Sequence, residues 1–202
     1  MKANKLRIAV QKEGRLREPS LNFLESSGLR FARENSRALI TPCQNVGIEI
    51  LYVRHRDIPQ YVQSGAADVG IVGENIIYED NPQIKVAKRL GFGKCSLVVA
   101  APKNSAIKTV FDLEGERIAT SYPNSLKRFL QQKKITASII EIRGSVEITT
   151  SLNIADAICD LVQTGKTFEE NGLVQIEKVL DSEAVLIQNP NKRTEEINIF
   201  QF

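Results

Sequence analysis

The sequence predicts an α/β fold built around a largely parallel sheet, in a chain long enough for one large domain or two small lobes. Short apolar runs rich in β-branched residues recur along the 202 residues, and amphipathic segments with helical spacing lie between several of them. A prior of about 150 residues per domain gives one to two units for a chain of this length. No linker rich in proline, glycine or serine divides it.

The predicted strands share valine, isoleucine, leucine and alanine bounded by turn residues. They lie at residues 6–10, 47–53, 68–73, 96–102, 116–122, 137–143 and 156–162. The first predicted helix spans residues 18–27, with Pro19 in its first turn and Gly28 directly after its end. Leu21 and Leu24 form its apolar stripe.

A second clear helix is predicted at residues 123–134, "PNSLKRFLQQKK". Pro123 suits its first turn, and Leu126, Phe129 and Leu130 have the i, i+3, i+4 spacing of one buried face. Alternation of such helices with the strands is what favours a parallel sheet.

Two apolar runs, at residues 94–105 and 182–190, each end in a polar turn that contains proline. If the chain crosses between lobes at both runs, the second lobe is inserted in the first. We therefore predict lobe I at residues 1–95 plus 180–202 and lobe II at residues 96–179.

Composition excludes several classes of protein. The net charge of +3 is spread along the chain, which suits a small anionic substrate and predicts no nucleic-acid partner. Cys43, Cys95 and Cys159 lie far apart without CxxC spacing, which argues against a disulfide framework and a zinc site. No apolar run reaches the length of a signal segment or a membrane span, so we expect a cytoplasmic protein without membrane association.

The stretch "DLVQTGKTFEENGL", residues 160–173, is the best candidate for a phosphate-binding loop. Gly165, Lys166 and Thr167 match the end of the P-loop pattern, but that pattern requires a glycine where Asp160 stands. A carboxylate at this position would repel phosphates, so the P-loop interpretation fails.

A second interpretation uses the acid. Asp160 is predicted at the carboxyl end of a strand, where open α/β sheets place ligands. Thr164, Gly165 and Thr167 then form a turn whose amides and hydroxyls converge on a phosphate, before a short helix. Acids for sugar hydroxyls and a donor-rich turn for a 5′-phosphate describe a phosphoribosyl site. The alternative is an ordinary turn after a strand, with Asp156 as a cap.

The stretch "ADAICDLVQTGKTFEENGL", residues 155–173, resembles the signature of the ATP phosphoribosyltransferases, the first enzymes of histidine biosynthesis. The likeness extends over nearly the whole chain, and its supporting stretches lie at residues 6–16, 52–75, 117–130 and 144–148. The resemblance implies transfer of a phosphoribosyl group from phosphoribosyl pyrophosphate to N1 of ATP, with Mg²⁺ required and pyrophosphate released. It also implies a two-lobed periplasmic-binding-protein-like (type II) fold with the active site in the interlobe cleft.

The resemblance assigns roles to individual residues, as hypotheses. The catalytic candidates are Lys12, Arg15 and Glu147. The phosphoribosyl-binding candidates are Asp156, Asp160, Thr164, Gly165, Lys166 and Thr167. The candidates for ATP or pyrophosphate are Gly14, Arg54, Asp57, Glu74 and Tyr122. The position of Lys166 is often small in relatives, which argues against a direct role for that side chain.

Each role has a structural alternative. Arg54 is as well explained by a surface ion pair, Glu74 by a helix cap and Tyr122 by packing at a helix start. His55, the only histidine, occupies a place where relatives often carry an acid, and we expect an exposed side chain rather than a general base. No base is needed, because N1 of adenine is already a nucleophile; catalysis then rests on alignment and on stabilising the departing pyrophosphate.

Partners follow from the same resemblance. Family members form homodimers or larger homo-oligomers. Long members carry a C-terminal histidine-binding domain, whereas short members take regulation from a subunit resembling histidyl-tRNA synthetase. The sequence of this chain is closer to that of the long members. Whether it is a natural short form or the catalytic part of a long form stays open.

Two rival functions remain. A non-catalytic small-anion binding module has the same fold, and a nucleotide hydrolase is the enzyme rival. The paired acids before the Thr-Gly turn have no obvious use in simple capture, and Asp160 weakens the hydrolase.

Overall fold

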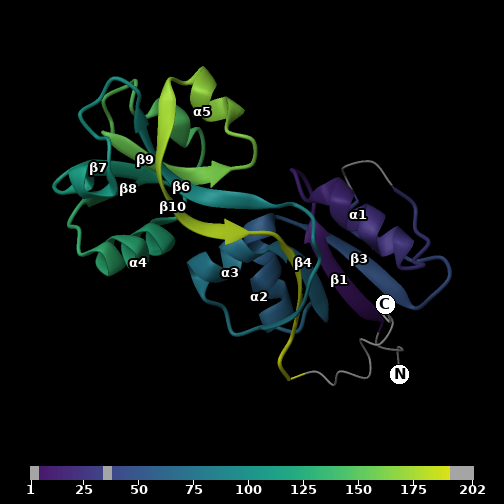
Figure 1. Cartoon of the computed structure of the whole chain (residues 1–202). Coiled ribbons are helices and arrows are strands. Elements are labelled where there is room, and N and C mark those ends of the chain that lie inside the picture. The colour runs from purple at the N-terminus through teal and green to yellow at the C-terminus, as the bar shows by residue number, and fades with distance from the viewer. Residues whose placement is uncertain (1–4, 34–37, 192–202) are drawn as a thin grey trace. The chain divides into compact units, whose positions relative to one another are not determined.

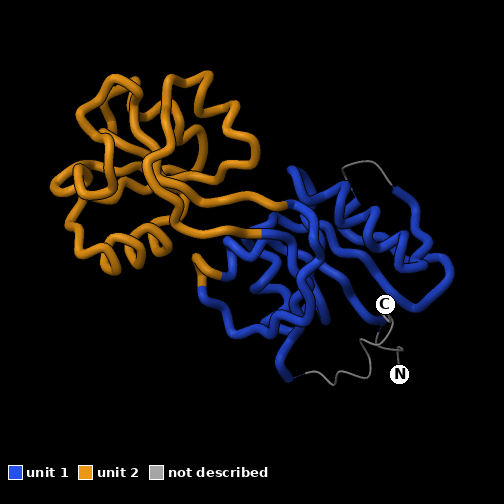
Figure 2. The backbone as a smooth tube through the Cα atoms, in the orientation of Figure 1, with its two compact units in different colours: residues 1–77, 81–93, 183–202 blue, residues 78–80, 94–182 orange. Residues whose placement is uncertain are grey.

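The structure is a computed structural model that describes residues 5–33 and 38–191. Internal contacts divide the chain into two compact units (Figure 2). Unit 1 comprises Met1–Ile77, Asn81–Gly93 and Glu183–Phe202, and unit 2 comprises Tyr78–Asp80 and Lys94–Ser182. The predicted lobe boundaries lie close to the crossings at 93/94 and 182/183, and the lobes as independent domains stay a prediction.

Within the described residues, unit 1 contains a six-stranded sheet in the order β2-β3-β1-β4-β11-β5 (Figure 1). Strand β1 is parallel to β3 and β4, whereas β11 is antiparallel to β4 and β5, and β2 is antiparallel to β3. The sheet is therefore mixed, which corrects the prediction of a largely parallel one. Its strands are β1 (Leu6–Gln11), β2 (Ile40–Pro42), β3 (Ile48–Val53), β4 (Val69–Gly73), β5 (Lys85–Arg89) and β11 (Ala184–Gln188).

The helices of unit 1 follow strands at the carboxyl ends of β1, β3 and β4. They are α1 (Arg17–Ser26), the 3-10 turn η1 (His55–Asp57), α2 (Ile58–Gln63) and α3 (Glu74–Asp80). The last three residues of α3, Tyr78–Asp80, belong to unit 2. Helix α1 confirms the first predicted helix, and its Leu21 and Leu24 are fully buried in the core formed with β1 and β3.

The end of α1 has the predicted glycine. Gly28 has φ 87° and donates its amide to Glu25 O at 2.9 Å, and the Leu29 amide reaches back to Leu24 O at 3.2 Å. This pair of bonds is the Schellman arrangement, which satisfies carbonyls that the last turn of a helix leaves without partners.

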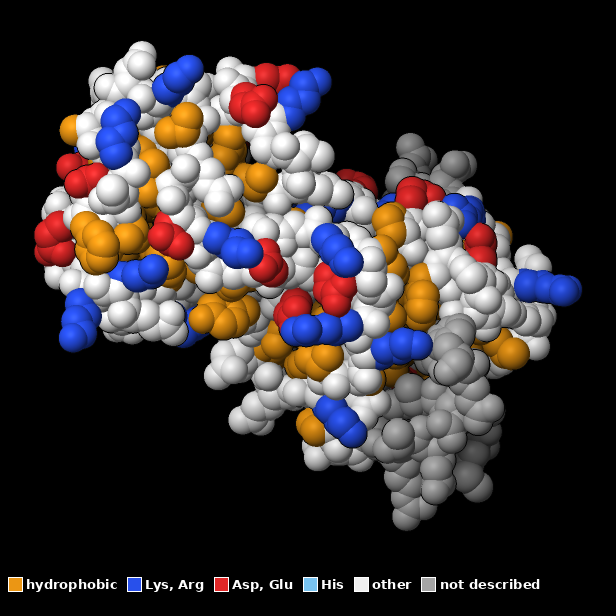
Figure 3. All heavy atoms as spheres, in the orientation of Figure 1, with side chains coloured by type: hydrophobic (Ala, Val, Ile, Leu, Met, Phe, Trp, Pro, Cys, Tyr) orange, Lys and Arg blue, Asp and Glu red, His pale blue; other side chains and the backbone are white. Residues whose placement is uncertain are grey.

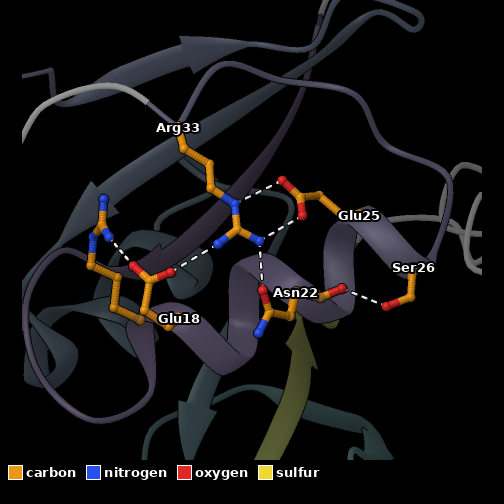
Figure 4. Close-up of polar contacts among 6 residues, drawn as sticks. Glu18, Asn22, Glu25, Ser26 and Arg33 are labelled. Atoms are coloured by element: carbon orange, nitrogen blue, oxygen red, sulfur yellow. Dashed lines mark hydrogen bonds and ion pairs between the residues drawn. The ribbon is translucent and has the colours of Figure 1, made fainter.

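The exposed side of α1 is tied to the segment that follows it by Arg33 (Figure 4). Its guanidinium bonds both oxygens of Glu25, at 2.8 and 2.5 Å, one oxygen of Glu18 at 2.9 Å and the Asn22 side chain at 2.5 Å. The bond from Arg33 is the main cause that lowers the pKa of Glu25. Surface pairs contribute little singly, but a shared arginine holds residues 29–33 against the helix.

Unit 2 has, in its described part, a five-stranded sheet in the order β10-β6-β9-β7-β8 (Figure 1). Strand β7 is parallel to β8 and β9, and β6 is antiparallel to β9 and β10, so this sheet is mixed as well. Its strands are β6 (Cys95–Pro102), β7 (Arg117–Thr120), β8 (Ser138–Glu141), β9 (Ala157–Val162) and β10 (Leu173–Ser182).

Short helical segments complete unit 2. They are η2 (Val110–Leu113), α4 (Pro123–Lys133), η3 (Val146–Ile148) and α5 (Lys166–Glu170). Helix α4 confirms the second predicted helix and buries Leu126, Phe129 and Leu130. Phe168 of α5 and Val146 of η3 pack in one cluster with the inner residues of β6 and β9.

Charges of both signs are interspersed on the face drawn in Figure 3. Ion pairs such as Lys178 with Asp181, at 2.8 Å, and Arg89 with Glu74, at 2.6 Å, join side chains that are mostly exposed. Of the helices in residues 5–33 and 38–191, none has the length and apolar character needed to cross a bilayer.

Candidate active-site residues

Asp160 lies in the carboxyl-terminal half of β9, between β6 and β7 in the sheet of unit 2. Because β7 and β9 run parallel, Thr120 at the end of β7 and Asp160 reach the same edge. The Asp160 carboxylate is half-buried and accepts the Leu161 amide at 2.8 Å through Oδ1. This is the edge at which α/β sheets bind ligands.

The turn that follows β9 exposes its polar groups. Gly165 has φ 81° and precedes the first residue of α5, and its carbonyl accepts the amides of Phe168 and Glu169 at 3.1 Å each. Thr164 and Thr167 are exposed on either side, while Phe168 is buried and holds the turn to the core. The first amides of a helix have no acceptor within it, so the turn offers amides and hydroxyls together.

The contacts of the Lys166 side chain do not favour a direct role in binding phosphate. Its ammonium lies 3.8 Å from Glu170 in an i, i+4 pair, with 80% of the lysine side chain exposed. Such a pair is typical of a solvated helix face.

Asp156 is engaged with Arg117 in the structure, and its predicted role at the ribose stays a prediction. It lies directly before β9, at the opposite end of the strand from Asp160, and its carboxylate forms a two-pronged pair with Arg117 at 2.7 and 2.9 Å. Four residues of extended chain span about 13 Å, so the backbones of the two acids lie far apart along the strand. The hydrogen bond from Arg117 lowers the pKa of Asp156 to about 2, although burial opposes it. Asp156 holds β9 to β7.

Glu147 lies in η3, which packs against β9. Val146 beside it is buried, and Ser145 before it has φ 47°, so the turn places the half-buried Glu147 side chain near the surface of unit 2. Tyr122 at the start of α4 is 5% exposed. This burial favours the packing alternative, and stacking of Tyr122 on the adenine stays a prediction.

The basic loop of unit 1, residues 12–16, joins β1 to α1. The Lys12 amide donates to Val53 O at 2.8 Å, so the loop starts beside the carboxyl end of β3. Gly14 has φ 112°, a conformation that favours glycine, and Arg15 is exposed. Lys12 keeps a third of its side chain exposed and lies 4.0 Å from Glu13.

Arg54, His55 and Asp57 follow β3 at the same edge of the unit 1 sheet. Arg54 and Asp57 are exposed, whereas His55 is half-buried, which corrects the expectation of an exposed histidine. Burial, then the nearby Arg56 and Arg15, lower the pKa of His55. The edge thus gathers arginine and lysine side chains from two loops that are neighbours in space, after β1 and after β3.

Glu74 begins α3 and pairs with Arg89 at 2.6 Å, while its amide donates to Glu183 O at 2.9 Å. The carboxylate lies in the first turn of α3 and forms an ion pair, but no side chain caps the start of this helix, so the role of Glu74 as a cap is not supported. Gln11 was not among the residues predicted for the site. It is a buried polar residue at the end of β1 whose side chain contacts the basic loop. In the sequence, only its place as a glutamine at the end of an apolar strand could have indicated this role.

Comparisons with known proteins agree on one family. The family model described as ATP phosphoribosyltransferase (HisG) matches residues 54–201. The ATP phosphoribosyltransferases of Maricaulis maris and Parabacteroides distasonis are 46% and 44% identical to the chain over 199 and 194 residues. The alignments cover 96% of this chain and 67% and 68% of the relatives, so the chain spans about two thirds of their length.

Solved structures give the fold. The ATP phosphoribosyl transferase (HisG:HisZ) complex from Thermotoga maritima is similar with a TM-score of 0.82 at 29% identity, covering 96% of this chain and 93% of that chain. The alkanesulfonate-binding protein SsuA from Xanthomonas axonopodis pv. citri has a TM-score of 0.62 at 14% identity, covering 100% and 71%, and bears on the fold alone.

Fold and relatives first define a class, the α/β proteins with a two-lobed periplasmic-binding-protein-like fold, which confirms the predicted fold class. Within that class the chain belongs to the ATP phosphoribosyltransferase family. It is an enzyme that transfers the phosphoribosyl group of phosphoribosyl pyrophosphate to N1 of ATP, in the first step of histidine biosynthesis. The predicted activity is confirmed, and the binding-module and hydrolase alternatives are not favoured.

Proposed function

We propose that unit 2 binds the phosphoribosyl group through Asp160 and the turn at residues 163–167. The observation that carries this proposal is an exposed turn of amides and hydroxyls that directly follows an acid at the ligand edge of the sheet. Asp160 accepts hydrogen bonds from the ribose hydroxyls. Thr164, Gly165 and Thr167 surround the 5′-phosphate, and Lys166 contributes its amide rather than its ammonium.

The basic loop of unit 1 is proposed to bind the pyrophosphate group or the phosphates of ATP. Lys12 and Arg15 supply charge, Gly14 lets the backbone approach the anion, and Arg54 lies on the neighbouring loop. Asp57 is exposed beside them and is kept as a candidate for ATP. Glu74, which pairs with Arg89, and Tyr122, which is almost fully buried, are weaker candidates for ATP.

The chemistry needs alignment more than acid–base catalysis. The lone pair of adenine N1 forms a bond to C1 of the ribose, and the bond from C1 to the pyrophosphate oxygen breaks with its electron pair leaving on pyrophosphate. No proton has to be removed from N1. Lys12 and Arg15 therefore act by stabilising charge on the departing group, and a carboxylate near the ribose stabilises its developing positive charge.

Mg²⁺ is proposed as the metal. Across residues 5–33 and 38–191, no three His, Cys, Asp or Glu side chains gather in a way that could hold a metal ion. Mg²⁺ is usually held by one or two carboxylates plus substrate phosphates, so we propose an ion that enters with pyrophosphate. Asp160 and Glu147 are the carboxylates that we assign to it. When bound, the ion neutralises part of the pyrophosphate charge.

We further propose that the chain works in the cytoplasm as a homo-oligomer, a dimer or larger. The solved relative from Thermotoga maritima is a HisG:HisZ complex, which supports a separate regulatory subunit as partner. Size-exclusion chromatography with light scattering, alone and with such a subunit, measures both assemblies. A monomer at assay concentrations would contradict the first proposal.

The phosphoribosyl site is tested by Thr164→Val and Thr167→Val. Loss of a hydrogen bond to a charged group costs about 1.5–3 kcal/mol, so the Kd for phosphoribosyl pyrophosphate should rise about 10- to 100-fold in each variant. Isothermal titration with Mg²⁺ present measures it. Ser151→Ala is the control, because its hydroxyl only bonds Ile148 O within unit 2. Equal affinity in the threonine variants and the control would contradict the assignment.

A further inference from the structure

Gln11 is the last residue of β1 and is only 8% exposed. It pairs with Val53 in the parallel register, directly before the basic loop at residues 12–16. Buried polar side chains are normally hydrogen-bonded, and the identity of the partners tells what the side chain holds in place.

Both bonds of the Gln11 carboxamide go to the basic loop. Its Nε2 donates to Glu13 O at 2.5 Å, and its Oε1 accepts the amide of Leu16 at 3.2 Å. One side chain therefore fixes the second and the last residue of the loop. Two bonds at the loop's ends, Lys12 N to Val53 O at 2.8 Å and Arg17 N to Gly14 O at 3.1 Å, complete the framework.

Gly14 closes over the same carboxamide. A Cβ at this position would overlap the Gln11 Nε2 atom, and the φ of 112° is unfavourable for any other residue. The glycine and the glutamine thus form one packed pair beneath the loop that carries Lys12 and Arg15.

We propose that Gln11 is a positioning residue, which holds the basic loop so that Lys12 and Arg15 meet the anionic part of the substrate. The inference rests on the proposed function of that loop. Long cationic side chains keep much of their rotamer freedom, so the placement of their backbone limits how well they align with an anion. Displacements of about 1 Å can cost about 100-fold in rate.

The test uses Gln11→Leu, which removes both bonds at similar volume, and Gln11→Glu, which keeps the acceptor for Leu16 but sets a carboxylate against Glu13 O. We expect kcat/KM to fall about 10- to 100-fold in Gln11→Leu. The inhibition constant for pyrophosphate should rise with it, and Gln11→Glu should lie between Gln11→Leu and the unchanged chain.

Asn189→Leu is the matched control for stability. Asn189 is also a buried carboxamide of unit 1: it donates to Val62 O at 2.9 Å and to Gln63 O at 3.2 Å, and it accepts the Asn191 amide at 2.8 Å. It adjoins Asp68, whose side chain bonds the Arg7 amide near the start of β1, whereas Gln11 is at the end of that strand. A purely structural glutamine should behave like Asn189, with a lower Tm and unchanged pyrophosphate inhibition.

Lys12→Ala and Arg15→Ala separate the two levels of the proposal. If both lower activity while Gln11→Leu matches Asn189→Leu in kinetics, the loop binds the anion and the positioning role of Gln11 is overturned. If neither changes kcat/KM or pyrophosphate inhibition, the proposed function of the loop fails, and the role of Gln11 fails with it. The inference is supported if Gln11→Leu, unlike Asn189→Leu, lowers kcat/KM and weakens pyrophosphate inhibition, and if Lys12→Ala and Arg15→Ala do the same.

Discussion

One oxygen of Glu79 accepts both the amide and the hydroxyl of Ser125, at 2.8 and 2.6 Å. Its other oxygen accepts the Asn124 amide at 2.8 Å, and the Glu79 side chain is almost fully buried. A carboxylate at the end of α3 thus occupies the N-terminus of α4, where a helix favours an anion. The start of α4 is therefore already satisfied, and phosphate binding falls to other parts of unit 2.

Replacing Glu79 by glutamine should destabilise unit 2. Its amide nitrogen cannot accept from backbone amides, and hydrogen bonds to charged groups are worth about 1.5–3 kcal/mol, so we expect a loss of about 2–4 kcal/mol in unfolding free energy. Urea unfolding followed by circular dichroism measures this loss. Glu141→Gln, an exposed acid half of whose side chain is open to solvent, is the control. Equal midpoints would contradict the capping role.

Asp156, directly before β9, and Asp160, within it, should have different functions. Asp160→Asn should weaken binding of phosphoribosyl pyrophosphate about 10-fold, because an amide is a poorer acceptor for sugar hydroxyls than a carboxylate. Asp156→Asn should instead lower Tm and leave that affinity within about twofold, since Asp156 is bound to Arg117. Titration calorimetry and thermal unfolding of both variants check the pair, and the opposite pattern would restore Asp156 to the site.

The Asp156–Arg117 pair also predicts a pH dependence. The pKa of Asp156 in the folded state is about 2, below the ordinary value of 3.8. The pair therefore stabilises the folded state fully above about pH 4, and this stabilisation is lost as the pH falls toward 2. With a third of the carboxylate side chain exposed, we expect about 1 kcal/mol. The pKa of Glu116 is raised by burial and by Asp156, so its contribution has the opposite sign.

Unfolding free energies between pH 5 and pH 2 measure this dependence. Asp156→Asn should flatten it by the same amount. An unchanged slope in the variant would show that other carboxylates carry the acid sensitivity.

Gly165 should tolerate substitution according to backbone conformation alone. A Cβ there meets nothing within 4 Å, but φ is 81°. Gly165→Ala should cost about 1–2 kcal/mol of local strain and raise the KM for phosphoribosyl pyrophosphate, whereas Gly165→Asn should be milder because asparagine enters this region more readily. Steady-state kinetics compare the two. If Gly165→Asn raised this KM and Gly165→Ala did not, backbone strain would be excluded as the explanation.

Much of the fold could be predicted because strong local patterns decided it. The buried strands β1, β3, β4, β6 and β9 are apolar runs in the sequence. Helices α1 and α4 each have an apolar face at helical spacing and a proline in the first turn. The edge strand β5 is exposed at every residue, so it has no hydrophobic pattern to detect. Strand β10 was missed because register shifts near Glu177 and Leu180 break its alternation.

The site was predicted by motif rather than by geometry. The order acid, turn, short helix was visible in the sequence. A motif does not tell which end of a strand each acid occupies, so the place of Asp156 directly before β9 could not be predicted. Gln11 and Glu79 were missed because their roles depend on partners that only the folded chain brings together.

The position of β11 orders events on the ribosome. This strand lies inside the first sheet, between β4 and β5, yet it is translated only after residues 94–182. Until residues 184–188 emerge, β4 has an unpaired edge and the early-made half of the protein lacks an interior strand. During synthesis, the sheet of unit 1 can therefore be completed only after all residues of unit 2 have been translated.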